Sequence, residues 1–339
     1  MTASAAPDRS CAASARGDAA PATSTSTATA AAAPARGDAA STTVPAAAPT
    51  VPASGLSGHV RLFGVDFTSA PRRAKPITIA AGVRDGDRLH VTGVDACARF
   101  DAFETWLATP GPWLAGFDFP FGLPRELVLA LGWPCTEADG DDAWTRLVRH
   151  LERTPRAQMV AAFRAFCDAR PPGGKFAHRA TDRPAGSSPS MKWVNPPVAF
   201  MLQAGAPRLL AAGVSVPGLH AGDPLRIALE TYPGALARAV LGRDSYKSDD
   251  RRKATPQRAC HRAALVDALA RGAHPLGIVV SMSDEERARC IDDAGADRLD
   301  AVLCLVQAAW ADQRRAANFG LPAMIDPVEG WIAGIPDAA

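Results

Sequence analysis

The run Gly295–Trp310 restricts the fold of this chain more than any other segment, because it has the pattern of a helix buried against a sheet. The apolar stripe of that helix would consist of Val302, Leu303, Leu305, Val306 and Ala309. Asp297 and Asp300 are three residues apart, so on a helix their carboxylates share one face. A buried helix that begins with two acids is suited to holding a divalent cation. In the alternative interpretation, one Asp caps the helix and the other complements its dipole.

Composition divides the chain into two parts. Residues 1–57 are almost entirely Ala, Pro, Ser, Thr and Gly, and such a segment cannot bury enough apolar surface to offset its ordering entropy. We therefore expect a disordered N-terminal tail at 1–57, followed by one folded domain at 58–336. The hydrophobic fraction of 47% supports a sizeable core in that domain. The net charge of +2 selects no class of partner.

The seven cysteines are scattered, and none belongs to a Cys-x-x-Cys pair. This pattern indicates reduced thiols in a cytoplasmic protein and not a zinc site or a disulfide framework. No apolar run approaches the length of a membrane-spanning helix, so we expect no membrane partner.

Hydrophobic patterning predicts an α/β fold. Five apolar, β-favouring runs predict strands at 59–66, 76–83, 88–94, 113–118 and 226–232. The sequence Arg84-Asp-Gly-Asp predicts a hairpin between the second and third strands. Helical patterns occupy 100–108, a short stretch from Pro124, 156–167, a stretch ending at 270, and a stretch from 283.

The order of these elements favours a ribonuclease-H-like mixed five-stranded sheet flanked by helices. In that arrangement the first and fourth strands lie side by side at the centre of the sheet. A largely helical or irregular insertion at about 133–223 would determine the substrate or cover the site.

Acids stand at the ends of three predicted strands: Asp66, Asp118 and Glu230. Carboxyl ends of adjacent strands form the crevice where ligands bind in open α/β sheets. Two carboxylates there repel one another unless a cation lies between them. Together with Asp297 and Asp300, these acids predict a site for Mg²⁺ or Mn²⁺. The alternatives are an Asx turn at Asp66, a strand stop at Asp118 and an ion pair between Glu230 and an arginine.

Four blocks of the chain, read in order, resemble those of the DUF429 family, a family of predicted nucleases with a ribonuclease-H-like fold. The blocks are Gly64-Val-Asp-Phe-Thr-Ser69, Gly116-Phe-Asp-Phe-Pro-Phe-Gly-Leu-Pro124, Glu230-Thr-Tyr-Pro233 and Asp297-Arg-Leu-Asp-Ala-Val-Leu-Cys304. The resemblance covers about Val60 to Trp331, and the last block is also similar to the acidic helix of Holliday-junction resolvases. It implies metal-assisted hydrolysis of phosphodiester bonds.

The resemblance assigns roles to the acids. Asp66 would bridge the metal ions, with Asp118 and Asp300 as further ligands. Asp297 and Glu230 would act as ligands or would orient them. The catalytic residues would be Asp66, Asp118, Glu230 and Asp300.

Basic and hydroxyl side chains are candidates for binding a nucleic-acid substrate. Lys247, Arg251, Arg252 and Lys253 form a local basic cluster that would contact phosphates or would be a solvated loop. Arg179 and Arg183 lie in a polar loop that would cover the site or would be an ordinary surface loop. Thr68 and Ser69 follow Asp66 as hydroxyls in a position to meet phosphate oxygens.

Two other functions remain open at the level of sequence. Gly64-Val-Asp-Phe-Thr-Ser69 also resembles the phosphate loop of actin-like phosphotransferases, which share this core. The third interpretation is a catalytically inactive nucleic-acid-binding protein. The patterns do not choose between DNA and RNA.

Overall fold

A computed structural model describes residues 60–248 and 254–336 of the chain. These residues all belong to one of the two units into which the chain divides, Ala47–Ala339. The predicted tail at 1–57 lies outside the described residues, and so do Arg251, Arg252 and Lys253.

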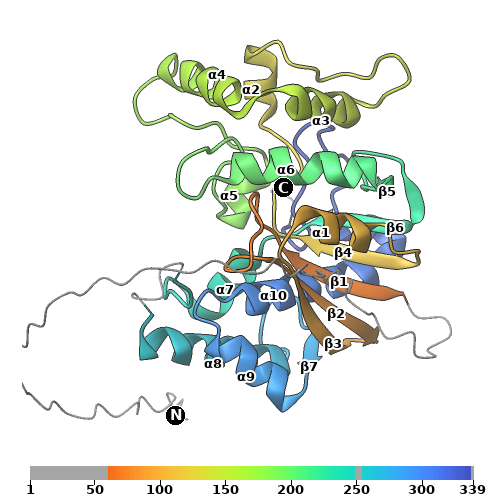
Figure 1. The fold of residues 1–339 in the computed structure, drawn as a ribbon, viewed down its shortest axis with the longest axis vertical. Coiled ribbons are helices and arrows are strands. Elements are labelled where there is room, and N and C mark those ends of the chain that lie inside the picture. Colours follow the sequence, from red (N-terminus) through yellow and green to blue (C-terminus); the bar gives the residue numbers. More distant parts are fainter. Residues whose placement is uncertain (1–59, 249–253, 337–339) are drawn as a thin grey trace, which may run out of the picture. The chain divides into compact units, whose positions relative to one another are not determined.

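The centre of the structure is a mixed sheet whose order is β5-β6-β4-β1-β2-β3-β7 over the described residues (Figure 1). Strands β4, β1 and β6 run parallel to one another, whereas β1, β2 and β3 form an antiparallel meander. The strands are β1 (Arg61–Asp66), β2 (Ile77–Asp85), β3 (Arg88–Cys97), β4 (Trp113–Phe117), β5 (Val214–Ser215), β6 (Asp223–Glu230) and β7 (Val279–Ser281). The β2–β3 hairpin turns at Gly86, whose φ of 57° suits glycine.

The prediction of an α/β fold with five strands is confirmed for the class and wrong for the strand number, because the sheet is 7-stranded. All five predicted strands are present. The two additional strands, β5 and β7, lie at the sheet edges and have 2 and 3 residues. Strands of that length are too short to show an alternating pattern in the sequence.

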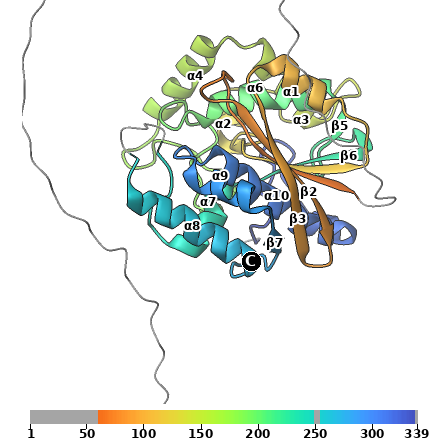
Figure 2. The ribbon, with the colours of Figure 1, turned by 60° about the horizontal axis from the view of Figure 1, so that its bottom comes forward.

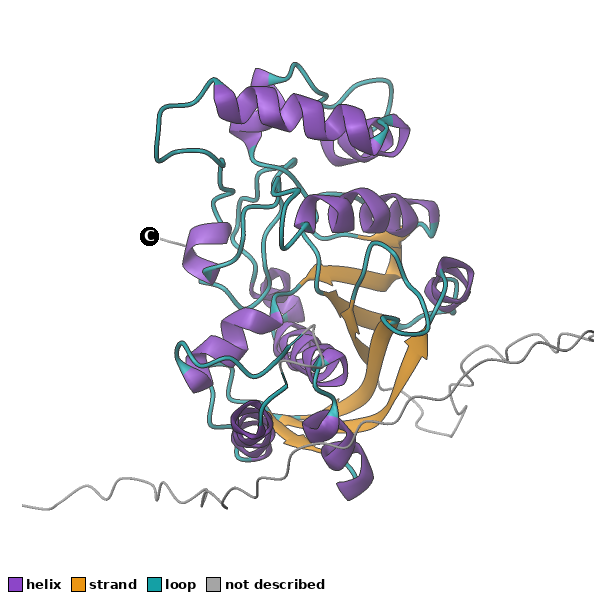
Figure 3. Ribbon diagram, turned by 60° about the vertical axis from the view of Figure 1, so that its left-hand side comes forward, coloured by secondary structure: helices purple, strands orange, loops and turns teal. Residues whose placement is uncertain are grey.

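Helices cover both faces of the sheet (Figures 2 and 3). One face packs on α7, α8 and α10, and the other packs on α1 and α6, with α3 and α4 beyond α6 (Figure 1). Alternation along β1 explains the two cores, since Leu62 faces the first set of helices while Phe63 and Val65 face the second. The helices are α1 (Phe100–Leu107), α2 (Arg125–Ala130), α3 (Ala143–Arg153), α4 (Arg156–Asp168), α5 (Asp182–Ala185), α6 (Val198–Ala211), α7 (Pro233–Leu241), α8 (Pro256–Ala270), α9 (Asp284–Asp292), α10 (Asp297–Gln313) and the 3-10 helix η2 (Arg315–Gly320).

The insertion at about 133–223 is helical and irregular, as expected, and it contains α3 and α6, which the sequence analysis did not identify. Asp142 caps the start of helix α3, because its side chain accepts a hydrogen bond of 2.6 Å from the Thr145 backbone N–H. Helix α6 contains Pro207 and is buried on several sides, so its sequence lacks a clear polar face. Among the described residues, no helix combines the length and apolar content needed to cross a membrane.

Candidate active site

Three acids stand at the carboxyl ends of three neighbouring parallel strands. Asp66 is the last residue of β1, Asp118 directly follows β4, and Glu230 is the last residue of β6. Backbone pairing fixes their alignment, because Phe117 is the register partner of both Val65 and Glu230. The predicted convergence of these strand ends is therefore present in the structure.

Two glycines bring helix α10 close to these strand ends. Gly64 of β1 and Gly116 of β4 are register partners at the centre of the sheet. A Cβ atom on Gly64 would lie 2.1 Å from the Ala301 carbonyl oxygen, and one on Gly116 would lie 2.9 Å from the Cys304 carbonyl oxygen. Because neither glycine has a side chain, α10 packs directly on the backbone of β1 and β4. Its first turn, with the acids Asp297 and Asp300, thereby lies beside the strand ends.

Each of the two acids in the first turn of α10 is paired with a lysine from a distant loop. Lys75 Nζ lies 2.5 Å from Asp297 Oδ1, and Lys247 Nζ lies 2.6 Å from Asp300 Oδ2. Asp300 is 1% exposed and also accepts a hydrogen bond of 2.6 Å from the Tyr246 hydroxyl. Burial lowers the pKa of the Lys247 ammonium, but Asp300 and Tyr246 outweigh this effect and hold the pKa well above its ordinary value. Both lysines therefore act as internal counter-cations.

The carboxylates of Asp66 and Asp118 are not fully compensated by nearby positive charges. Burial raises the pKa of Asp66 well above its ordinary range, and Asp300, Asp297 and Asp118 raise it further. Burial also raises the pKa of Asp118 to about 7, with Lys247 opposing the shift and Asp300 adding to it. Both raised pKa values mean that ionising these carboxyl groups is unfavourable at the strand ends. A divalent cation between these carboxylates would remove that cost.

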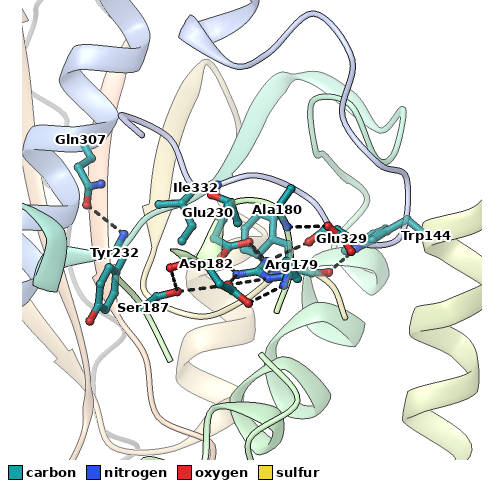
Figure 4. A network of polar contacts seen from close by, with 12 residues as sticks. Trp144, Arg179, Ala180, Asp182, Ser187, Glu230, Tyr232, Gln307, Glu329 and Ile332 are labelled. Atoms are coloured by element: carbon teal, nitrogen blue, oxygen red, sulfur yellow. Dashed lines mark hydrogen bonds and ion pairs between the residues drawn. The ribbon is translucent and has the colours of Figure 1, made fainter. Parts of the chain in front are cut away.

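Glu230 is held differently from the other strand-end acids, because it forms a buried ion pair with Arg179 (Figure 4). Arg179 Nη2 lies 2.6 Å from Glu230 Oε1 and Arg179 Nη1 lies 2.7 Å from Glu230 Oε2. The same guanidinium donates to Asp182 Oδ1 at 2.9 Å and to the Glu329 carbonyl oxygen at 2.9 Å. The ion-pair interpretation of Glu230 is therefore confirmed.

This network joins three distant segments of the chain. Glu230 belongs to β6 and Arg179 and Asp182 to the insertion, while Glu329 lies near the C-terminus. Glu230 Oε2 also accepts from the Phe121 backbone N–H at 2.9 Å, and Glu329 Oε2 accepts from the Ala180 backbone N–H at 2.9 Å. The network fixes the insertion to the end of β6, next to the other acids.

The three strand-end acids line a cavity of about 410 Å³, which we call the acidic pocket, whereas Asp297 and Asp300 are not among its lining residues. Residues from the insertion segment 187–201 also line it, and we call that part of the lining the wall. The residues that line it are Asp66, Phe67, Thr68, Ser69, Lys75, Asp118, Phe119, Pro120, Arg179, Ser187, Ser188, Asn195, Pro196, Pro197, Val198, Met201, Glu230, Thr231, Tyr232, Lys247 and Ile332.

The predicted substrate-binding residues divide into three groups. Thr68, Ser69 and Lys247 line the acidic pocket. Arg179 also lines it, but its guanidinium is 2% exposed and is used by Glu230 and Asp182, so the surface-loop interpretation is wrong for this residue. Arg183 is exposed and is not part of the pocket lining, and Lys253 lies outside the described residues.

Three lining or supporting residues were missed at the level of sequence: Lys75, Thr231 and Tyr246. Lys75 closes the short basic run Arg72-Arg-Ala-Lys75 in the loop after Asp66, which was a usable signal. Thr231 follows Glu230 directly, and its buried Oγ1 has no hydrogen-bond partner of normal geometry among the residues that the structure describes. Tyr246 precedes Lys247, and its hydroxyl reaches Asp300.

The donor chemistry of the pocket fits a hard cation, whereas the present positions of the side chains are those of an ion-paired state. Asp66 and Asp118 in the pocket lining offer carboxylate oxygens, the ligand type that Mg²⁺ and Mn²⁺ prefer, and Asp297 and Asp300 lie near Asp66 without lining the pocket. Within 60–248 and 254–336, no group of three or more His, Cys, Asp or Glu side chains is arranged to hold a metal ion. Binding would therefore require Lys247 to move away from Asp300.

Comparison of the chain with protein-family models, curated proteins and solved structures finds no match in any of the three. The site itself therefore carries the functional argument.

Proposed function

We propose that this chain is a Mg²⁺- or Mn²⁺-dependent phosphodiester hydrolase, a nuclease, built on a ribonuclease-H-like core. The strand order supports the core assignment, because an antiparallel β1-β2-β3 meander continues through β1 into the parallel strands β4 and β6. The resemblance of the four sequence blocks to the DUF429 family points in the same direction.

One observation carries the proposal: Asp66 and Asp118 end adjacent parallel strands and line one pocket, with Asp300 approaching from α10. A divalent cation bound there would lower the pKa of an attacking water and neutralise charge on the phosphate. Asp66, Asp118 and Asp300 would hold the cation, and Asp297 would support them. The alternative for α10, with one Asp capping and one complementing the dipole, does not explain why both acids are paired with lysines.

The remaining pocket residues bind and orient the substrate in this proposal. Thr68 and Ser69 would donate hydroxyl hydrogen bonds to phosphate oxygens. Lys75 and Lys247 would exchange their carboxylate partners for the phosphate once the cation is present. Glu230 would orient the site through the Arg179 network and not as a ligand, because the buried Arg179 guanidinium pairs with both of its oxygens and is itself held in place by Asp182.

The proposal is tested with purified protein and labelled DNA and RNA in single-stranded, duplex and branched forms, with Mn²⁺ or with EDTA. Cleavage should require Mn²⁺ and should be lost in Asp66→Asn, because an amide keeps the shape of the carboxylate and removes the charge that holds the cation. Asp85→Asn, an exposed hairpin position, is the matched control and should keep full activity. Equal cleavage by the wild type and Asp66→Asn would reject the proposal.

The second candidate is a phosphotransferase of the actin-like class, which the hydroxyls of Thr68 and Ser69 in the pocket favour. The same variants separate the two functions. ATP hydrolysis that disappears in Asp66→Asn, without cleavage of any phosphodiester, would support this second candidate.

A further inference from the structure

The insertion contributes one wall of the acidic pocket. Its segment between α5 and α6 contributes Ser187, Ser188 and Asn195, and the first two turns of α6 contribute Val198 and Met201. A phosphate ester at the acids would therefore have its organic group against this wall.

Much of the wall is packed into the core, although its positions 194–197 are exposed. Met191 and Ser190, between the two serines and Asn195, are both fully buried, at 0% exposure. Gly205 of α6 lies so close to Phe119 that a Cβ atom there would be 2.5 Å from the phenyl ring. The Arg179 network fixes the start of the same segment, since Ser187 Oγ lies 3.2 Å from Asp182 Oδ1 (Figure 4). The size of the pocket is therefore a property of the fold.

The volume of about 410 Å³ is near the lower end of the range for small-molecule sites. A space of that size holds one nucleotide or a similar phosphate ester. A duplex carries its phosphodiesters along a stiff rod whose major groove alone is about 12 Å wide. Such a rod would not bring an internal phosphodiester to carboxylates as deeply buried as Asp66 and Asp300, which are 7% and 1% exposed. For a single strand, the volume leaves no room inside the pocket for a nucleotide on each side of the phosphodiester.

On this basis we infer that the substrate is a phosphodiester with one group no larger than a nucleoside, either a small free diester or the last nucleotide of a strand. The inference rests on the proposed hydrolase function and narrows it. Val198 and Met201 supply apolar surface for a base or sugar, while Ser187, Ser188 and Asn195 supply hydrogen-bonding groups. Lys75 and Lys247 also line the pocket and would pair with the phosphate.

Three probes with Mn²⁺ test the inference: bis(p-nitrophenyl) phosphate, an internally labelled linear single strand, and covalently closed circular single-stranded DNA. The circular DNA should stay intact. Hydrolysis of bis(p-nitrophenyl) phosphate would indicate that the substrate is a small free diester, whereas release of mononucleotides from the linear strand would indicate that it is the last nucleotide of a strand. Asp66-dependent cleavage of the circle would overturn the inference and leave the proposed hydrolase standing. Failure to cleave all three would end both.

A binding experiment tests the wall without reference to turnover. Met201→Trp would fill the pocket and should weaken binding of adenosine monophosphate, measured calorimetrically with Mn²⁺, by about tenfold or more. Met324→Trp, at a position that is 90% exposed and outside the pocket lining, is the matched control and should bind as the wild type does. Unchanged binding by a folded Met201→Trp would overturn the inference.

Discussion

Replacing Arg179 with methionine should destabilise the fold severely, although this arginine lies at a pocket that we propose to be catalytic. Its guanidinium donates to Asp182 and Glu230, which are 0% and 3% exposed, and to the Glu329 carbonyl oxygen. Methionine would fill the volume but leave two buried carboxylates without a counter-charge. Breaking a buried ion pair in this way costs roughly 3–5 kcal/mol. For a domain of this size, that corresponds to a fall in melting temperature of roughly 6–20 °C.

Thermal and urea denaturation followed by circular dichroism measure the effect. The matched control is Arg99→Met, which removes an exposed Arg–Asp pair whose side chains are 77% and 58% exposed, and it should leave the melting temperature unchanged. The loss in Arg179→Met should shrink at low pH. Burial raises the pKa of Glu230 and Arg179 opposes that shift. Without the arginine this carboxyl therefore takes up a proton more readily, and its unpaired charge disappears as the pH falls.

A triple variant, Arg179→Met with Asp182→Asn and Glu230→Gln, should recover part of the lost stability, because buried neutral amides cost less than buried charges. The reasoning is refuted if Arg179→Met is no less stable than Arg99→Met. In that case Glu230 would not need Arg179, and it would be available as a metal ligand.

Two further predictions concern the other acids. Lys247→Gln should raise the affinity for Mn²⁺ by about tenfold in calorimetric titrations, because the lysine ammonium competes with the cation for Asp300. Inorganic phosphate should bind less tightly to the same variant. Weaker binding of Mn²⁺ would contradict the role of Lys247 as a counter-cation. The pKa of Asp118 rises from 3.8 to about 7, so the metal-free folded state keeps a proton that the unfolded state has lost, and stability should fall as the pH rises through that window. Asp118→Asn should therefore stabilise the metal-free protein at pH 8 by about 1–3 kcal/mol and abolish Mn²⁺ binding, whereas Asp85→Asn should do neither.

The strand ends and α10 could be predicted because their signals are local. The apolar runs that end at Asp66 and Asp118 have the length and composition of buried strands, and the stripe behind Asp297 and Asp300 has the period of a helix. The signal for α3 was equally local, since Trp144, Leu147 and Leu151 follow the capping residue Asp142 at helical spacing, so that helix could have been found.

The partners of the acids could not be predicted, because they come from distant parts of the chain. Arg179 reaches Glu230 across 51 positions and Glu329 across 150. Its neighbours Gly173, Gly174 and Ser187 have the composition of a surface loop, and nothing local to Arg179 indicates burial. The pairings of Lys75 with Asp297 and of Lys247 with Asp300 are likewise long-range.

The two lysines explain how the proposed site can exist before a cation arrives. The four carboxylates Asp66, Asp118, Asp297 and Asp300 would carry four negative charges, and Lys75 and Lys247 offset two of them. Two negative charges remain, which is the amount that one divalent cation neutralises. The raised pKa values of Asp66 and Asp118 place this unbalanced charge at the strand ends. In the proposed function a divalent cation would displace the protons held there. The lysines released from α10 would then pair with the phosphate, so that binding of the cation would strengthen binding of the substrate and the reverse.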